Sequence, residues 1–201
     1  MRDHEKATGS PGRPREFDEA DFLAKIMSLF WEKGYEGTGL SDIMNATGLQ
    51  KGSLYKAFGS KQDMYVRALA HYERLIVDNA VQALRTGGDP MLRIRAFLSA
   101  PIEAAWDKND RRGCFLCNAS ADRAALDAEA QALVVRGYDK LEAALKVAVG
   151  DAHTDWPDVT IASMAQLLLS VYSGLRVMAR AHVERDRLEG AKEASLALLA
   201  L

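Results

Sequence analysis

The chain has 201 residues, 48% of them hydrophobic, and a formal net charge of -2 at pH 7. Such a small net charge excludes a protein that coats nucleic acid by charge alone, and 2 cysteines are too few for a small secreted fold held by disulfides. The first residues lack the apolar run of a secretory signal, and the most apolar stretch, 164–179, contains Gln166 and Arg176, so we expect a cytoplasmic protein with no membrane segment.

A change in composition separates an N-terminal arm from the first helix. Residues 1–16 are rich in Gly, Pro and charged side chains, which predicts a flexible basic arm. Apolar residues at helical spacing follow from Phe22 to Phe30, and Asp18 offers a cap for the start of this helix. Gly34 is predicted to end it.

Two short helices come next, with a glycine between them. They are predicted over about 40–47 and 51–58, and Gly48 supplies the left-handed residue that a tight turn requires. Gly59 ends the second helix, and Ser60 opens the following one in an S-x-x-D pattern. Two short helices joined by a glycine turn and flanked by longer ones form the helix-turn-helix pattern.

The rest of the chain shows only helical periodicity. No segment alternates apolar and polar residues as a strand does, so the fold class is predicted to be all-α. We expect a helix-turn-helix domain over 17–65 and a C-terminal domain for ligand binding and dimerisation over 66–201. The further helices are predicted at about 60–86, 89–107, 115–124, 127–149, 158–182 and 185–200.

The second short helix has two different faces. Leu54 and Phe58 lie four residues apart and are predicted to point inward. The opposite face carries basic and hydroxyl side chains, which suit the phosphates and base edges of double-stranded DNA, namely Lys51, Ser53, Tyr55 and Lys56. Gly52 allows close backbone approach, and Lys61 lies in the first turn of the next helix, where exposed amides also attract phosphate.

The string from Gly34 to Tyr65 resembles a known family. The pattern T-x-x-x-D-I, followed by G-x-x-K-G-S-L-Y-x-x-F-x-S-K, is similar to the DNA-binding domain of the tetracycline-repressor (TetR) family. The resemblance implies an all-α homodimer that pairs through its last two helices, binds palindromic operator DNA as a repressor, and is released by a small-molecule inducer.

Site residues follow from the same resemblance. It implies phosphate contacts by Thr38 and Tyr55, and groove or phosphate contacts by Lys51, Gly52, Ser53, Lys56 and Lys61. Arg13 and Arg15 resemble an arm that some members lay along the minor groove. Gly39 and Met44 depart from the family pattern, in which a hydroxyl residue and alanine are commoner.

The C-terminal segment has no catalytic or metal-binding motif. Nucleotide-binding glycine loops, H-E-x-x-H and G-x-S-x-G are absent from it, so we expect no enzyme, no cofactor and no metal. An enzyme that kept a regulator's fold is the rival class. An inducer cavity would combine apolar side chains with a few polar anchors, and the candidates are Phe97, Trp106, Phe115, Asn118, Tyr138, Met164 and Tyr172, with core packing as the alternative for each.

The last two predicted helices carry apolar residues for pairing. Those on the first are Leu167, Leu168, Val171, Leu175 and Met178, and those on the second are Leu188, Leu196 and Leu199. In the family such helices pair across a two-fold axis. Symmetry also suits the DNA task, because two recognition helices must lie about 34–36 Å apart to reach successive major grooves.

The segment RRGCFLCNAS holds both cysteines. Cys114 and Cys117 lack a second ligand pair for zinc and the βαβ setting of a redox enzyme. Arg111, Arg112 and a helix beginning after Cys114 would favour its thiolate, with Cys117 as a resolving thiol. The string resembles a subgroup of the family in which some members sense electrophiles or oxidants. A redox switch without a small-molecule pocket and an inert buried thiol are both left open.

Overall fold

The computed structural model describes residues 19–123 and 126–200, and within them every regular element is a helix. The all-α fold class is therefore confirmed. Asp18, Arg13 and Arg15, predicted as a helix cap and a DNA-binding arm, lie outside the described residues. The elements in chain order are α1 (Glu19–Gly37), α2 (Leu40–Thr47), α3 (Lys51–Phe58), α4 (Lys61–Tyr72), the π-helix η1 (Glu73–Val77), α5 (Asp78–Arg85), α6 (Pro90–Trp106), α7 (Phe115–Ala121), α8 (Ala128–Ala152), α9 (Asp158–Arg180), α10 (Arg185–Ala197) and the 3-10 turn η2 (Leu198–Ala200).

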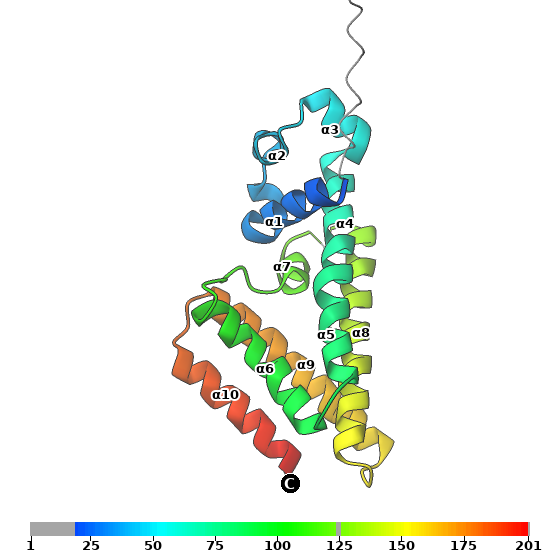
Figure 1. Ribbon diagram of the computed structural model, residues 1–201, viewed down its shortest axis with the longest axis vertical. Coiled ribbons are helices and arrows are strands. Elements are labelled where there is room, and N and C mark those ends of the chain that lie inside the picture. The colour runs from blue at the N-terminus through cyan, green and yellow to red at the C-terminus, as the bar shows by residue number, and fades with distance from the viewer. Residues whose placement is uncertain (1–18, 124–125, 201) are drawn as a thin grey trace, which may run out of the picture.

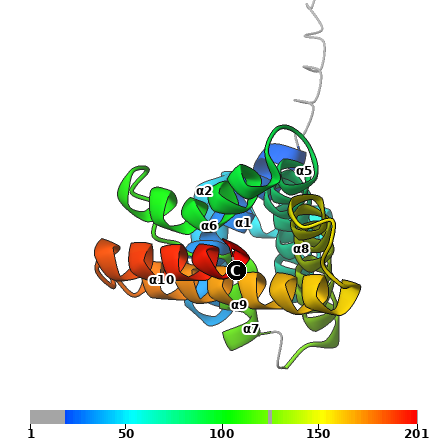
Figure 2. The ribbon, with the colours of Figure 1, turned by 90° about the horizontal axis from the view of Figure 1, so that it is seen from below.

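The helices α1 to α3 lie at one end of an elongated molecule, and α4 runs from them into the body (Figure 1). There α4, η1 and α5 follow one another alongside α8, while α6, α9 and α10 pack together on the other side. Figure 2 shows α9 and α10 side by side across the base of the molecule. The short helix α7 lies between the two parts and contacts α1, α4, α8 and α9.

Aromatic side chains form the junction between α1, α4 and α7. Phe30 meets Tyr65 edge to face at 5.1 Å between ring centroids, and Tyr65 meets Phe115 in the same way at 5.7 Å. Tyr72 contacts both Phe115 and Trp31. All five rings are buried, so the helix-turn-helix end and the body share one continuous core.

The structure differs from several predicted helices, and three of these differences are the clearest. The helix expected over 60–86 contains the π-helical turn η1, where the buried carboxylate of Glu73 pairs with Arg136 and Lys140 of α8. The first helix continues to Gly37 beyond a non-helical residue at Gly34 (φ 74, ψ 178). The helix α8 runs to Ala152, beyond the predicted end at about residue 149. One extra residue in a turn leaves the apolar spacing almost unchanged, so periodicity alone does not reveal it.

Among the described residues α9 is long and apolar enough to cross a membrane, judged by length and composition alone. That is weak support, because a core helix passes the same test. Leu168, Tyr172 and Leu175 of α9 are buried, and the helix packs on α6 and α8. Only 28% of its most apolar window is buried, which leaves an apolar face uncovered within one chain.

Candidate DNA-binding surface and effector cavity

The turn between α2 and α3 has the geometry of a helix-turn-helix. Gly39 begins α2, and its backbone N–H donates to the carboxylate of Asp42 at 2.9 Å. Gly48 ends α2 in the left-handed conformation (φ 73), which only glycine adopts at little cost, and its N–H donates to the Met44 carbonyl. The chain then turns through two residues into α3.

The helix α3 has the predicted division into two faces. Leu54 and Phe58 are buried in the core shared with α1 and α4. Lys51, Gly52, Ser53, Tyr55 and Lys56 are exposed, with Tyr55 at 40% of its full exposure. Buried apolar anchors therefore hold the helix while its basic and hydroxyl side chains face outward. This is the orientation that a groove-reading helix requires.

The start of α4 is capped as the S-x-x-D pattern predicts. The Asp63 N–H donates to Ser60 Oγ at 3.2 Å, and both the hydroxyl and the N–H of Ser60 donate back to the Asp63 carboxylate at 2.7 Å. These bonds hold the pKa of Asp63 below its usual range. Lys61 lies in this first turn with its ammonium 4.4 Å from the ring centroid of Tyr35, which holds the lysine between α1 and α4.

Thr38 requires a correction. Its side chain is fully buried, and its hydroxyl donates to the Gly34 carbonyl at 2.7 Å, so this proton is not available to a phosphate. The bond spans the bend after Gly34 and orients the segment that enters α2. Thr38 therefore acts as a positioning residue in this structure. Sequence spacing alone did not distinguish a hydroxyl on the surface from one that closes a bend.

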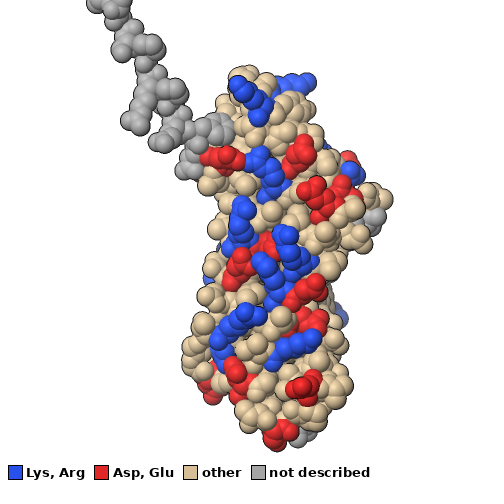
Figure 3. All heavy atoms as spheres, turned by 90° about the vertical axis from the view of Figure 1, so that its right-hand side faces the viewer, with Lys and Arg blue, Asp and Glu red and all other residues tan. Residues whose placement is uncertain are grey.

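Charge is distributed unevenly over the surface. Figure 3 shows Lys and Arg alternating with Asp and Glu along the body, whereas Lys and Arg stand without acidic neighbours at the tip. On the body Lys140 pairs with both Glu73 and Asp78. Lys140 is thus neutralised on the body, while exposed Lys51 and Lys56 of α3 form no ion pair within the described part of the chain. A nearly neutral protein can in this way present a local cationic surface to DNA.

The body contains an apolar cavity of about 550 Å³ bounded by α5, α6 and α9. Phe97 and Tyr172 stack in its wall with ring centroids 4.1 Å apart. The size and apolar lining fit a small organic ligand. Arg176 and Ile76 line this cavity and also a second one, so the two spaces share a boundary.

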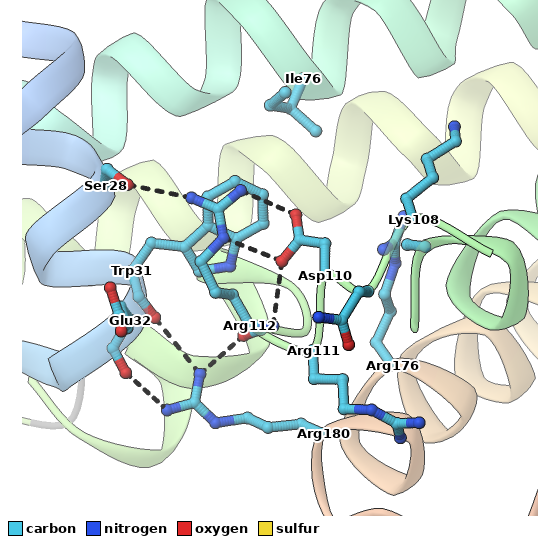
Figure 4. Close-up of a pocket in the computed structure, with 12 residues that line it drawn as sticks. Ser28, Trp31, Glu32, Ile76, Lys108, Asp110, Arg111, Arg112, Arg176 and Arg180 are labelled. Carbon is cyan, nitrogen blue, oxygen red and sulfur yellow. Dashed lines mark hydrogen bonds and ion pairs between the residues drawn. The ribbon is translucent and has the colours of Figure 1, made fainter. Parts of the chain in front are cut away.

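The second cavity is cationic, has a volume of about 990 Å³ and reaches the helix-turn-helix end. Arg112 stacks on Trp31 of α1 at 3.9 Å, donates to Ser28 Oγ, and forms an ion pair with Asp110 at 2.7 Å (Figure 4). The Arg112 guanidinium lowers the pKa of Asp110. Figure 4 also shows Arg180, from the last turn of α9, reaching backbone carbonyls of α1 and the Arg112 carbonyl.

The predicted ligand residues do not converge on one cavity. Phe97 and Tyr172 line the apolar cavity, whereas Phe115 and Asn118 border a smaller space of about 300 Å³ beside α1. The Asn118 amide is used structurally, because it donates to the Trp31 and Arg112 carbonyls. The remaining three pack elsewhere, with Trp106 under Arg111, Tyr138 hydrogen-bonded to Cys117, and Met164 against the core.

Both cysteines are buried, and they interact. The Cys117 thiol and N–H donate to the Cys114 sulfur, and these bonds, together with Tyr72 and Arg176, lower the Cys114 pKa to about 6 against the effect of burial. The hydrogen bond to Cys114 and burial raise the pKa of Cys117. The Cys114 pKa is lowered, as predicted, and the start of α7 contributes through the Cys117 N–H. The predicted role of the two arginines was wrong, because Arg111 stacks on Trp106 and Arg112 pairs with Asp110.

Comparisons with known proteins identify the helix-turn-helix end first. Residues 22–68 match the family described as bacterial regulatory proteins, tetR family. The uncharacterized HTH-type transcriptional regulator YezE of Bacillus subtilis is 28% identical over 94% of this chain and 99% of its own length. The HTH-type transcriptional repressor BdcR of Escherichia coli is 25% identical over 87% of this chain and 85% of its own.

A solved structure extends the likeness to the whole body. The TetR family regulator CifR, a cysteine mutant in complex with 26-base-pair operator DNA, is 26% identical, covers 92% of this chain and 98% of its own, and has a TM-score of 0.79. These relatives are regulators of transcription and not enzymes. An exposed basic α3, the matching family region and this full-length likeness lead to one conclusion: the chain is a DNA-binding transcriptional regulator whose helix-turn-helix end, residues 22–68, is that of the TetR family.

Proposed function

We propose that this regulator is a cytoplasmic repressor that binds a palindromic operator as a homodimer and leaves it when a small molecule occupies the cavity of the body. The observation that carries the proposal is the outward face of α3, held by buried Leu54 and Phe58. Lys51, Ser53, Tyr55 and Lys56 would contact the major groove and its flanking phosphates, with Gly52 permitting close approach and Lys61 near a phosphate.

The proposed dimer interface is the uncovered face of α9 and α10. Leu168 and Leu175, expected there, are buried within one chain instead, and so are the leucines predicted for α10. Positions 163, 167, 170, 174 and 177 of α9 form an uncharged stripe with alternating spacings of four and three, in which Leu167 and Val177 are 40% and 53% exposed. The outer face of α10 is mostly small, with Gly190, Ala191 and Ala194 exposed. Such faces allow close helix packing.

A dimer follows from the DNA task as well. Two recognition helices related by a two-fold axis reach successive major grooves only when about 34–36 Å apart. A ligand that prefers a different spacing would shift the population away from DNA. The contacts of Arg112 and Arg180 with α1 offer a direct path from the cavities to the helix-turn-helix end.

Two experiments with the full-length protein test this proposal. The first selects bound duplexes from a random pool, and the second is footprinting on the selected duplexes. We expect a palindromic site protected on both half-sites by a dimer. Val177→Glu should shift sedimentation towards the monomer and weaken operator binding, whereas Val135→Glu, at an exposed position of α8, should change neither. Protection of one asymmetric half-site by a monomer would contradict the proposal.

The thiol pair supports a second candidate, a regulator switched by oxidants or electrophiles. Its basis is the lowered pKa of Cys114 and the adjacent Cys117, a combination that favours reaction of the Cys114 thiolate. Operator affinity should then fall after mild peroxide or a quinone in the wild type but not in Cys114→Ser. Equal responses of the two proteins would leave Cys114 as a packing residue, in keeping with its burial.

A further inference from the structure

We infer that the effector is an amphipathic acid, whose apolar body fills the cavity between α5 and α6 and whose carboxylate binds Arg176 at the boundary of the two cavities. This inference rests on the proposed effector-controlled repressor and specifies the chemistry of its ligand. It follows from three observations on the described residues: an open apolar cavity, an arginine facing it without a carboxylate partner, and neighbouring arginines already engaged.

The apolar part of the site is accessible from solvent. Leu75, Ile76 and Leu92 line the cavity and are exposed, Leu92 by 63%, although large apolar side chains usually gather inside. Phe97 and Tyr172 provide a stacked aromatic wall farther in. Three exposed apolar side chains surround one opening, so the transfer of an apolar molecule from water to this place is favourable in free energy.

Arg176 stands at the inner boundary of this cavity. Its Nε donates to the neutral hydroxyl of Tyr172 at 3.0 Å, and the guanidinium is only partly exposed. Within the described part of the chain no carboxylate forms an ion pair with it, although Asp110 is close enough for Arg176 to lower its pKa. A partly desolvated guanidinium with free N–H donors favours a bidentate acid as partner.

The neighbouring basic groups are less available. Arg112 is paired with Asp110, Arg180 donates to three backbone carbonyls, and Arg93 is paired with Asp151. The cationic cavity is lined by five basic and two acidic side chains, so its overall charge also favours an anion. An acid entering through the apolar opening would therefore meet Arg176 first among the unpaired charges.

Calorimetric titration of the full-length protein with matched probes tests the inference. The probes are 4-phenylbutyrate, 4-phenyl-1-butanol and 4-phenylbutylamine, which share one apolar body and differ in charge. We expect the carboxylate to bind at least about tenfold more tightly than the alcohol, the usual range for a hydrogen-bonded charge pair, and the amine to bind most weakly. Equal affinity for acid and alcohol would overturn the inference and leave the Cys114 thiolate as the counter-charge of Arg176.

Variants separate the two halves of the site. Arg176→Met should remove the preference for the acid while leaving the Kd of the alcohol unchanged, and Arg176→Lys should retain part of the preference. Ala100→Phe, which fills the apolar cavity and keeps Arg176, should weaken all three probes. Arg95→Met is the matched control, because Arg95 pairs with Glu193 outside the cavities. A preference for the acid that survives Arg176→Met would also overturn the inference.

Operator binding, measured without probe in the same samples, distinguishes this failure from failure of the proposed function. If the protein binds its selected operator and the alcohol releases it as readily as the acid does, the proposed function stands and the acidic effector is refuted. A protein that binds 4-phenylbutyrate through Arg176 but whose operator affinity never changes supports the acid site and refutes effector-controlled release. Binding of none of the probes refutes the acid site.

Discussion

Replacing Arg180 with methionine removes a guanidinium that connects α9 to the helix-turn-helix end. Its Nη1 donates to the Trp31 and Arg112 carbonyls at 3.2 and 2.6 Å, and its Nη2 donates to the Glu32 carbonyl at 3.1 Å. Trp31 and Glu32 lie just before the bend of α1 at Gly34, where regular helical bonding is interrupted. Their carbonyls therefore depend on donors from outside α1.

The magnitude follows from the number and exposure of these bonds. A hydrogen bond from a charged donor contributes about 1.5–3 kcal/mol. Water can replace the exposed bond to Glu32, and Asn118 also donates to the Trp31 and Arg112 carbonyls, so we expect a loss of about 2–4 kcal/mol in the free energy of unfolding. In a chain of this size that lowers Tm by roughly 5–12 °C. Methionine preserves the aliphatic packing, so the loss reflects the guanidinium.

The assay combines thermal unfolding with operator titration in the presence and absence of effector. Arg180→Met should still bind operator at a temperature where it is folded, but the effector should change its affinity much less than in the wild type. Arg95→Met, which removes an exposed pair with Glu193, should leave both stability and effector response near wild type. A stable Arg180→Met protein with a full effector response would refute this reasoning.

Three further predictions concern the DNA-binding surface and the core. Lys61→Ala should weaken binding to all duplexes alike and reduce the slope of log affinity against log salt by about 1. Lys56→Ala should instead relax the preference at particular base pairs, where the wild type loses about 1–3 kcal/mol of binding free energy for a wrong base. Identical effects of both variants on all sequences would contradict the placement of Lys56 in the groove. Gly59→Ala should destabilise by about 1–3 kcal/mol, because Gly59 has φ 78 and an added Cβ would lie 2.5 Å from the Asp63 carboxylate, while Gly52→Ala, with open space around it, should raise Tm slightly. Glu73→Gln should destabilise at neutral pH; the paired carboxylate has a lowered pKa, so the difference from wild type should shrink as the pH falls below about 4.3, and a gap unchanged at pH 3 would argue against the ion pairs.

Local patterns in the sequence predicted the helix-turn-helix end well. Gly48, the Ser60 cap and the spacing of Leu54 and Phe58 each act through neighbours within four residues, and the structure places all of them as expected. The one misplaced side chain there is Thr38, whose hydroxyl bonds to Gly34 across a bend. The bend arises where the chain leaves α1, and helical periodicity gives no information on the path of a chain beyond the end of a helix.

The candidate effector cavity was harder to predict because its residues come from distant segments. Phe115 and Tyr138 are aromatic like Phe97, yet they pack against α4 and Cys117, and no local pattern separates these outcomes. One signal was present in the sequence. Arg176 lies one turn after Tyr172 in α9, whose other charged residues, Asp158 and Arg180, lie in its first and last turns, and a charge at such a position must be satisfied by a partner or a ligand.

In the proposed mechanism few contacts connect the cavities with the helix-turn-helix end. Their number limits the change in DNA affinity that an effector can cause. Releasing a repressor by a hundredfold loss of affinity requires about 2.8 kcal/mol of difference in ligand affinity between the two states. Arg112 contacts Ser28 and Trp31, and Arg180 holds two carbonyls of α1, so two or three such contacts at about 1 kcal/mol each are sufficient. If the effector is an acid bound at Arg176, it would bring negative charge beside the Asp110–Arg112 pair and compete with Asp110 for the arginines. In the proposed mechanism, loss of the Arg112 contact with α1 would free the bend at Gly34 and let the recognition helices leave the spacing that DNA requires.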